Sequence, residues 1–339
     1  MSISTSSSKW KLSSVVILPV YGSLGVLIPS TSLFQLSISS SLIFNFSYSL
    51  GLSALIFLDA SIASFKTQRK LTVIDFSKFP QDEKASYEGA NGGKICVLFN
   101  NERYMVKFPP IPTKTEEMSY TNSCISEYIG CHIFEFVGIE VQKTLLGKYK
   151  VKNGKEKIVV GCKDFTSPGI ILRPFAALKN QNFDSSSNGY GTELSDILES
   201  FTKQHIFEIN LLSERFWDMF IVDALIGNWD RHNGNWGFLV DPATGKAEIA
   251  PVFDCGSCLL PQADESVMRK VLDDAAELEA RIFTFPSSML KQGGVKINYS
   301  KFLSAPCEEL SAAMKRIVPR IDFAAIARLV DETPYLTDL

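Results

Sequence analysis

The sequence predicts an α+β fold in which a small, strand-rich lobe is followed by a larger and mostly helical lobe. Short runs of β-forming residues, separated by turn residues, extend to about residue 166, and helical periodicity dominates from residue 167 onward. The first 70 residues fit neither pattern, because they are dense in serine and contain no charged residue between Leu12 and Leu58. We therefore expect an apolar N-terminal extension over residues 1–70, a first lobe over residues 71–166 and a second lobe over residues 167–339.

The overall composition is that of an ordinary globular protein. The 339 residues are enough for two domains, or for one two-lobed unit with an extra segment. The net charge is −3 without a block of basic residues, so we expect no nucleic-acid partner. The seven cysteines are an odd number at scattered positions, so we expect thiols rather than a disulfide framework. Cys255 and Cys258 form a lone C-x-x-C sequence, and we expect thiols there too, because a structural zinc site needs four ligands and no second Cys pair is close in sequence.

Two apolar runs in the extension, at residues 12–28 and 41–58, each approach the length of a membrane-spanning helix. The first follows two lysines, as the core of a signal peptide would, but no A-x-A cleavage site comes after it. Basic residues follow the second run and would keep the downstream lobes on the cytoplasmic side if residues 41–58 span a membrane. The same run could also contact a membrane without spanning it. The favoured interpretation is a leader, or an extension from a start site assigned too early, outside the functional fold.

Two hairpins and one helix are expected in the first lobe. Residues 94–100 and 103–109 predict the first hairpin, and residues 139–150 and 156–165 predict the second, around an Asn-Gly turn. Between the hairpins, a Thr-x-x-Glu sequence has the spacing of a capping box and predicts a helix over residues 116–137.

The second lobe is expected to begin with a polar loop, followed by two helices, a hairpin and a mostly helical end. The helix over residues 213–227 is the strongest prediction, because Phe216, Phe220 and Ala224 follow one another at i+4 spacing and Gly227 can end it. The other predicted segments are the loop at 183–192, a helix at 194–205, hairpin strands at 236–240 and 247–253, and helices over 265–330.

The loop "GNWDRHNGNWGF" collects polar side chains between that helix and the hairpin, and its aromatic residues indicate that the core holds it in place. If the hairpin turn centres on Thr244, Asn235 lies opposite Phe253, so Asn235 and Asp254 meet at a strand end. An amide oxygen and a carboxylate suit Mg²⁺, which takes its other ligands from water and phosphates. Asp230 could orient or deprotonate a hydroxyl beside that metal, which is typical of a phosphotransferase.

The first lobe offers groups that could hold a nucleotide. The glycine-rich sequence "YEGANGGK" lies before a strand, where its backbone N–H groups could cover phosphates. Lys107 places an ammonium in an otherwise apolar strand, and a buried lysine needs a partner. We choose Glu127, because isoleucines surround it in mid-helix, whereas Glu116 and Glu117 lie in the exposed first turn.

Each of these features also has a structural interpretation when it is taken alone. A glycine-rich sequence is usually a turn, Lys107 could reach solvent, Glu127 could lie on a solvated face, and Asp254 could cap a turn. They occur in the order that phosphate transfer needs, and two of them are expected to meet. The functional interpretation is therefore favoured.

With these residues placed, the chain resembles protein kinases of the HipA type over nearly all of residues 71–339. The sequences that carry the resemblance, by their order and spacing, are "GANGGK", "YMVKFPP", "EEMSYTNSCISEYIGCHI", "VQKTLLGKYK" and "FWDMFIVDALIGNWDRHNGNWGF". The resemblance implies a two-lobed protein-kinase-like fold of the HipA C-terminal type. It also implies a serine/threonine protein kinase that uses ATP and Mg²⁺, phosphorylates a protein substrate and autophosphorylates.

The resemblance also implies roles for single residues. Asp230 is similar to the catalytic aspartate of the family, and Asn235 and Asp254 are similar to its metal ligands. Lys107 is similar to the phosphate-contacting lysine, and Glu127 is similar to the glutamate that pairs with it.

Two further segments are similar to parts of the family's nucleotide site. The sequence "GCKDFT" is similar to the hinge, which implies that the backbone of Lys163 and Phe165 meets adenine. The sequence "SYEGAN" is similar to the loop with an autophosphorylated serine, which makes Ser86 the candidate. The loop residues expected to bind ATP are Gly89, Ala90, Asn91 and Gly92.

The resemblance leaves other functions and partners open. Residues 1–70 do not resemble the subdomain through which HipA binds its antitoxin and DNA, so an antitoxin partner is not implied. The sequence "DRHNGN" also resembles the loop of phosphoinositide-type lipid kinases, and a non-catalytic kinase-like binding module, tethered through residues 41–58, is a third interpretation. We expect the protein in the bacterial cytoplasm or, as an effector, delivered into host cells, with the N-terminal membrane anchor as the alternative.

Overall fold

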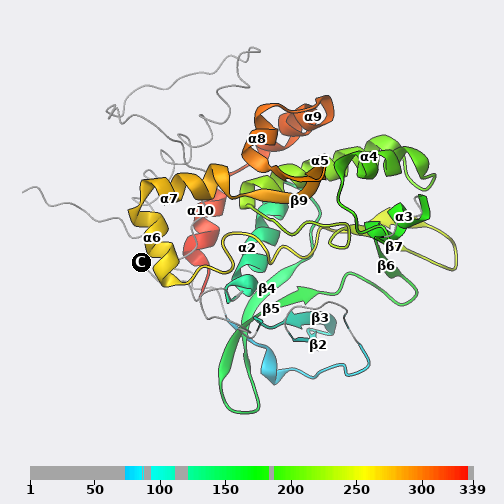
Figure 1. Cartoon of the computed structure of the whole chain (residues 1–339). Coiled ribbons are helices and arrows are strands. Elements are labelled where there is room, and N and C mark those ends of the chain that lie inside the picture. Colours follow the sequence, from blue (N-terminus) through cyan, green and yellow to red (C-terminus); the bar gives the residue numbers. More distant parts are fainter. Residues whose placement is uncertain (1–72, 86, 88–92, 111–120, 183–186, 335–339) are drawn as a thin grey trace, which may run out of the picture.

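The computed structural model describes residues 73–334, except residue 86 and residues 88–92, 111–120 and 183–186 (Figure 1). The expected N-terminal extension, with both of its apolar runs, therefore lies outside the described residues. Within the described ranges, no helix combines the length and the apolar character that crossing a bilayer requires.

The first lobe is built on a five-stranded sheet with the strand order β1-β4-β5-β3-β2. Both predicted hairpins are present, since β2 pairs with β3 and β4 pairs with β5 in antiparallel register. The turn between β2 and β3 places Asn100 and Asn101 at φ of 52° and 63°, a left-handed conformation that asparagine tolerates better than most residues. The strands are β1 (Ile74–Asp75), β2 (Lys94–Phe99), β3 (Glu102–Lys107), β4 (Thr144–Lys150) and β5 (Glu156–Lys163).

The second lobe is mostly helical, as the sequence predicts. Both predicted helices ahead of the polar loop are present, and Gly227 ends the longer one at φ of 64°. The α-helices are α3 (Phe175–Asn182), α4 (Leu194–Lys203), α5 (Ile209–Ile226), α6 (Glu265–Asp273), α7 (Ala275–Glu279), α8 (Tyr299–Ser304), α9 (Glu308–Ile317) and α10 (Phe323–Glu332). The second lobe also contains the 3₁₀ helix η4 (Val318–Arg320) and the π-helix η3 (Ala280–Thr284), and the first lobe contains the 3₁₀ helix η1 (Phe76–Lys78).

The second lobe also contains strands that the sequence prediction missed. The hairpin of β9 (Ser287–Gln292) and β10 (Val295–Asn298) interrupts the region predicted to be helical. Its turn, Gly293-Gly294, has φ of 61° and 79°, so two adjacent glycines were the available signal. The strand β6 (Ile171–Pro174), also unpredicted, extends the hairpin that follows the polar loop into a three-stranded sheet.

The predicted register of that hairpin is wrong by one residue. β7 (Gly237–Val240) and β8 (Ala247–Ile249) pair Phe238 with Ile249, so the turn centres between Ala243 and Thr244 rather than on Thr244. The Asp241 carboxylate accepts hydrogen bonds from the Ala243 N–H and the Thr244 hydroxyl, which fixes this turn locally. The strand register therefore does not place Asn235 opposite Phe253.

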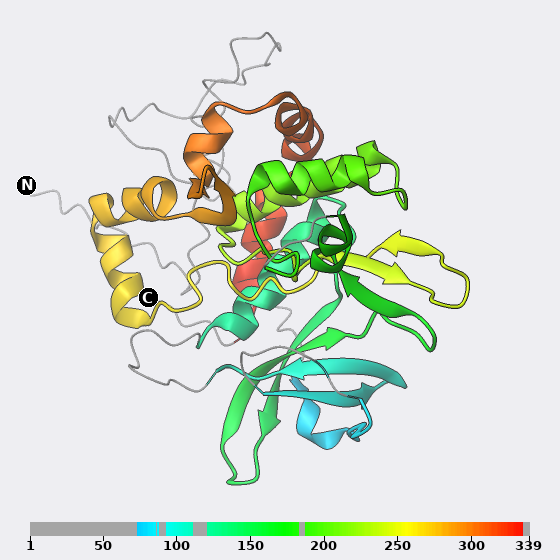
Figure 2. The ribbon, with the colours of Figure 1, turned by 45° about the vertical axis from the view of Figure 1, so that its right-hand side comes forward.

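The helix α2 (Ser123–Phe136) lies between the sheet and the helices of the second lobe (Figure 2). It contacts β4 and β5 on one side and α5 and α10 on the other. The predicted start at residue 116 is wrong, because residues 121 and 122 form a turn, and the predicted capping box lies outside the described residues. Asn122 instead hydrogen-bonds Pro261 and Ala263, contacts distant in sequence that local patterns do not reveal.

One hydrophobic core runs through both lobes. It includes the apolar faces of α2 and α5 and reaches β4, β5 and the C-terminal helices. A smaller cluster around Phe76 fills the other face of the five-stranded sheet. Because α2 belongs to the larger core, a side chain on α2 has a fixed position relative to both lobes.

Candidate active site

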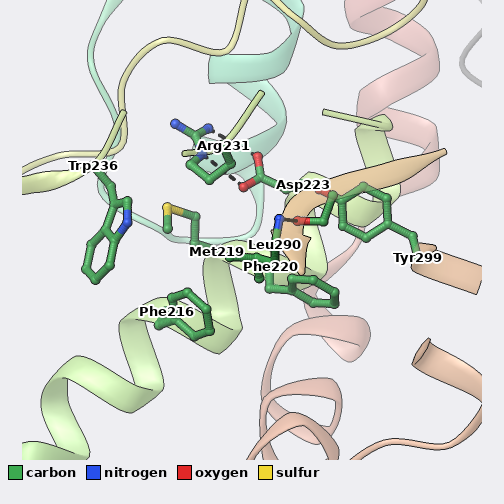
Figure 3. A pocket seen from close by; sticks show the side chains of 9 residues that line it. Phe216, Met219, Phe220, Asp223, Arg231, Trp236, Leu290 and Tyr299 are labelled. Atoms are coloured by element: carbon green, nitrogen blue, oxygen red, sulfur yellow. Dashed lines mark hydrogen bonds and ion pairs between the residues drawn. The ribbon is translucent and has the colours of Figure 1, made fainter. Parts of the chain in front are cut away.

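The polar loop after α5 is fixed from inside the protein by a buried ion pair. The Arg231 Nε donates to Asp223 Oδ2 over 2.9 Å, and its Nη2 donates to Asp223 Oδ1 over 3.1 Å. Figure 3 shows these two groups facing each other beside Trp236 and Tyr299. Burial would lower the pKa of Arg231, but the Asp223 carboxylate outweighs it and raises that pKa well above its usual value. The guanidinium is therefore always charged and anchors the loop.

The same guanidinium brings the two predicted metal ligands toward each other. Arg231 Nη1 donates to the Asn235 carbonyl over 2.7 Å and also to the Phe253 carbonyl, immediately before Asp254. The one-residue error in strand register thus does not separate Asn235 from Asp254. Sequence reasoning missed this link, although Asp223 in the apolar run "FIVDALIG", eight residues before Arg231, was a readable signal.

A hydrogen bond joins Asp230 and Asn235 within this loop. The Asn235 side chain donates from Nδ2 to the Asp230 carbonyl over 2.9 Å, so its Oδ1 is the atom left to accept a cation. Asn235 is buried, and its position is fixed by this bond. Burial raises the pKa of Asp230, and the nearby Asp254 charge adds to the rise. A higher pKa makes Asp230 a stronger base than an exposed aspartate.

Lys107 on β3 is bound by two carboxylates from distant parts of the chain. Its ammonium lies 2.8 Å from Glu127 Oε2 on α2 and 2.9 Å from Asp254 Oδ1 in the loop after β8. Burial would lower the pKa of Lys107, but the Asp254 and Glu127 carboxylates outweigh it and raise that pKa well above its usual value. Glu127 is buried and uses its other oxygen to accept the Cys255 N–H over 3.0 Å. The sequence-based choice of Glu127 as the partner of Lys107 agrees with this geometry.

Asp254 combines an ion pair with access to solvent. The Lys107 ammonium lowers the pKa of Asp254 to about 2, so this carboxylate is ionised at neutral pH. Its side chain is 45% exposed, unlike that of Glu127, so it can reach a group outside the protein. Its backbone has φ of 58°, an unusual conformation for a non-glycine residue and one that recurs at functional sites.

Asn235 Oδ1 and the Asp254 carboxylate fit a magnesium ion that also binds phosphates. Both are hard oxygen donors, and Mg²⁺ is commonly held by one or two protein ligands together with water and phosphate oxygens. Across the described ranges, no cluster of three or more His, Cys, Asp and Glu side chains could hold a metal ion.

The predicted hinge residues, Lys163 and Phe165, lie at the end of β5 and just after it, and each has a defined contact in the structure. The Lys163 N–H donates to the Lys143 carbonyl, and the Lys163 carbonyl accepts from Gln142 Nε2, leaving that oxygen one further lone pair. The Phe165 ring lies 5.8 Å from that of Phe253, directly before Asp254. The predicted adenine-binding segment therefore lies close to the residue before the predicted metal ligand Asp254.

Some predicted site residues lie outside the described residues. Lys94, a lysine beside Lys107, was not among the predicted site residues. The structure does not describe the loop residues Gly89, Ala90, Asn91 and Gly92, or Ser86. Lys94 follows that loop and pairs across the strands with Lys107, and burial, with the charge of Lys107, lowers the pKa of Lys94. The strand register was the signal for this second lysine.

Comparison with known proteins identifies the family. The chain is 48% identical over 271 residues to the serine/threonine-protein kinase CtkA of Helicobacter pylori. The matched region covers 79% of this chain and 82% of CtkA. It belongs to the CtkA family of serine/threonine-protein kinases. The kinase family predicted from the motifs is therefore confirmed. No family model matches the chain.

The solved structure of CtkA agrees with the two-lobed kinase fold. The crystal structure of the H. pylori proinflammatory kinase CtkA has a TM-score of 0.74 and 49% identity, covering 78% of this chain and 89% of that one. A structure of HipA from Shewanella oneidensis, in complex with HipB and operator DNA, has a TM-score of 0.42 at 16% identity and covers 84% of this chain and 66% of that one.

Removing one partner of the buried ion pair should be strongly destabilising. The Asp223→Ala substitution leaves the Arg231 guanidinium buried without its carboxylate, which should lower the free energy of unfolding by about 3–5 kcal/mol. The matched control is Glu199→Ala on α4, which removes an exposed pair with Lys203, and it should cost less than about 1 kcal/mol. Equal values for the two variants in chemical denaturation would contradict the proposed anchoring role.

The ion pair of Asp254 should make stability depend on pH in the acid range. The folded-state pKa of about 2 lies below the ordinary value of 3.8, so the stabilisation is complete above pH 3.8 and is lost as the pH falls toward 2. The advantage of the wild type over Asp254→Asn in free energy of unfolding should therefore be constant near neutral pH and shrink below 3.8. A difference that does not change with pH across this window would show that the ion pair does not stabilise the fold.

Proposed function

We propose that this chain is an ATP-dependent serine/threonine protein kinase that transfers the γ-phosphate of ATP to a protein hydroxyl. One observation supports this most strongly. The Lys107 ammonium joins Glu127 from α2 and Asp254 from the loop after β8, across 20 and 147 residues of sequence. A cation fixed in this way beside a solvent-accessible carboxylate suits the phosphates of a metal-bound nucleotide.

Each residue of the site has a role in the proposed reaction. Asp230 positions the acceptor hydroxyl and receives its proton, and its raised pKa favours that transfer. Lys107 contacts the phosphates, while Glu127 holds the ammonium in place. Asn235 and Asp254 would hold Mg²⁺, which when bound neutralises charge on the phosphates.

The remaining parts of the nucleotide site are proposed from the sequence together with these contacts. The Phe165 N–H and the remaining lone pair of the Lys163 carbonyl would bind adenine. The loop Gly89–Gly92 would cover the phosphates, and Ser86 beside it would be an autophosphorylation site. Residues 71–166 and 167–339 would be the two lobes, with the nucleotide between them. The partner that we propose is a protein with an acceptor serine or threonine.

Replacement of Asp230 tests this function directly. The full chain is incubated with radiolabelled ATP, Mg²⁺ and a generic acceptor protein, and Asp230→Asn should lower the rate of label transfer by about 10²–10⁴-fold. ATP binding by the variant should be retained, because Lys107 and Asp254 are unchanged. The matched control is Asp273→Asn, an exposed aspartate on α6, which should transfer label at the wild-type rate.

Three outcomes would contradict the proposal in different ways. Full activity of Asp230→Asn would remove the assigned role of Asp230. Transfer to phosphoinositide vesicles but not to proteins would indicate a lipid kinase. ATP binding without transfer to either acceptor by the wild-type chain would indicate a kinase-like binding module.

A further inference from the structure

An exposed aromatic side chain lies beside the catalytic loop. Tyr190 is 50% exposed, and its ring lies 6.2 Å from that of His232 in an edge-to-face arrangement. His232 follows Asp230 by two residues, and its Nδ1 accepts the Gly234 N–H over 2.9 Å. A Cβ atom on Gly234 would lie 2.8 Å from His232 Cε1 and 2.9 Å from Tyr190 Cε1. The Tyr190 and His232 rings therefore pack tightly over this glycine.

Buried polar groups fix the backbone on both sides of Tyr190. Asn233 of the catalytic loop is buried, and its Nδ2 donates to the Gly189 carbonyl and to the Gly191 carbonyl, each over 2.8 Å. These two glycines are the immediate neighbours of Tyr190. The catalytic loop therefore determines where the tyrosine lies.

A buried lysine strengthens this attachment. Lys179 on α3 is 2% exposed and donates to the same Gly191 carbonyl over 2.7 Å. Burial lowers the pKa of Lys179, and the Asp196 carboxylate, 3.8 Å away, only partly opposes this. A buried ammonium needs hydrogen-bond acceptors, so the Gly191 carbonyl is held in place by Lys179 as well as by Asn233.

This arrangement differs from that of other exposed apolar side chains. A large aromatic ring is normally packed away, and isolated exposed apolar residues need no explanation. The backbone on both sides of Tyr190, however, accepts hydrogen bonds from the Asn233 side chain, in the loop that contains Asp230. Phe285 is similarly exposed, at 56%, but its ring lies against the guanidinium of Arg281, in its own helical segment. The ring lies beside His232, two residues after Asp230, where it is available to a segment that binds along this loop.

We propose that Tyr190 is a specificity-determining residue of the acceptor site. Its exposed ring contacts an apolar side chain close in sequence to the acceptor serine or threonine of the substrate protein. The inference rests on the proposed kinase function. Rigid aromatic side chains suit this role, because they offer a large contact area and lose little conformational entropy on binding.

The experiment measures acceptor selectivity with a peptide library. Each peptide has a central serine with degenerate flanking positions, and the full chain transfers label from radiolabelled ATP in the presence of Mg²⁺. The wild type should prefer apolar residues at one flanking position. Tyr190→Ala should lose that preference and raise the KM for the best peptide about tenfold, with the KM for ATP unchanged.

Two further variants separate recognition from a general effect on the loop. Tyr190→Phe keeps the ring and should retain the wild-type preference, whereas Phe285→Ala removes a comparably exposed ring elsewhere and should change nothing. Loss of kcat, a rise in the KM for ATP, or an equal loss of rate for all peptides in Tyr190→Ala would show a structural role and overturn the inference. The same selectivity and peptide KM in the wild type and Tyr190→Ala would also overturn it, but would leave the kinase function intact. Absence of label transfer by the wild type would overturn the proposed function and this inference together.

Discussion

The ammonium of Lys107, bound at once by Glu127 and Asp254, is the interaction on which the arrangement of the site depends. A desolvated lysine in the sheet needs nearby negative charge, and here two carboxylates supply it from α2 and from the loop after β8. The contact requires α2 to pack on the sheet and requires that loop to return to the edge of the first lobe. One charged side chain thereby fixes three separate parts of the chain relative to one another.

A second charge cluster supports the first from the side of the second lobe. Arg231 is paired with Asp223 in the interior and binds the carbonyl groups of Asn235 and Phe253. The two clusters meet at Cys255, whose N–H donates to Glu127 and whose sulfur accepts from Arg231 over 3.4 Å. Asp254 lies between these attachments, which explains how the chain maintains an unusual backbone conformation at this residue.

The sequence predicted the parts of the molecule that depend on local patterns. The two hairpins of the first lobe follow from their runs of β-forming residues and, for the second, from its Asn-Gly turn. Helix α5 follows from its apolar spacing and Gly227. The choice of Glu127 over Glu116 and Glu117 needed only the apolar surroundings of that residue in mid-helix. The kinase family followed from the order and spacing of several motifs rather than from any one of them.

Features set by tertiary contacts could not be predicted in the same way. The start of α2 depends on hydrogen bonds from Asn122 to Pro261 and Ala263, and the β7–β8 register depends on which side chain organises the turn. Arg231 was read only as part of a polar loop, because its contacts with the Asn235 and Phe253 carbonyls involve backbone atoms that a motif does not reveal. The link from Asn233 to the segment around Tyr190 is of the same kind.

We propose that Lys107 and Glu127 act as one unit in phosphate transfer, and a double-mutant cycle tests this most directly. Transfer rates from radiolabelled ATP are measured for the wild type, Lys107→Ala, Glu127→Ala and the double variant. If Glu127 acts only by holding the ammonium of Lys107, the double variant should be no slower than Lys107→Ala alone. Losses that multiply in the double variant, or a wild-type rate for Lys107→Ala, would contradict this account of the site.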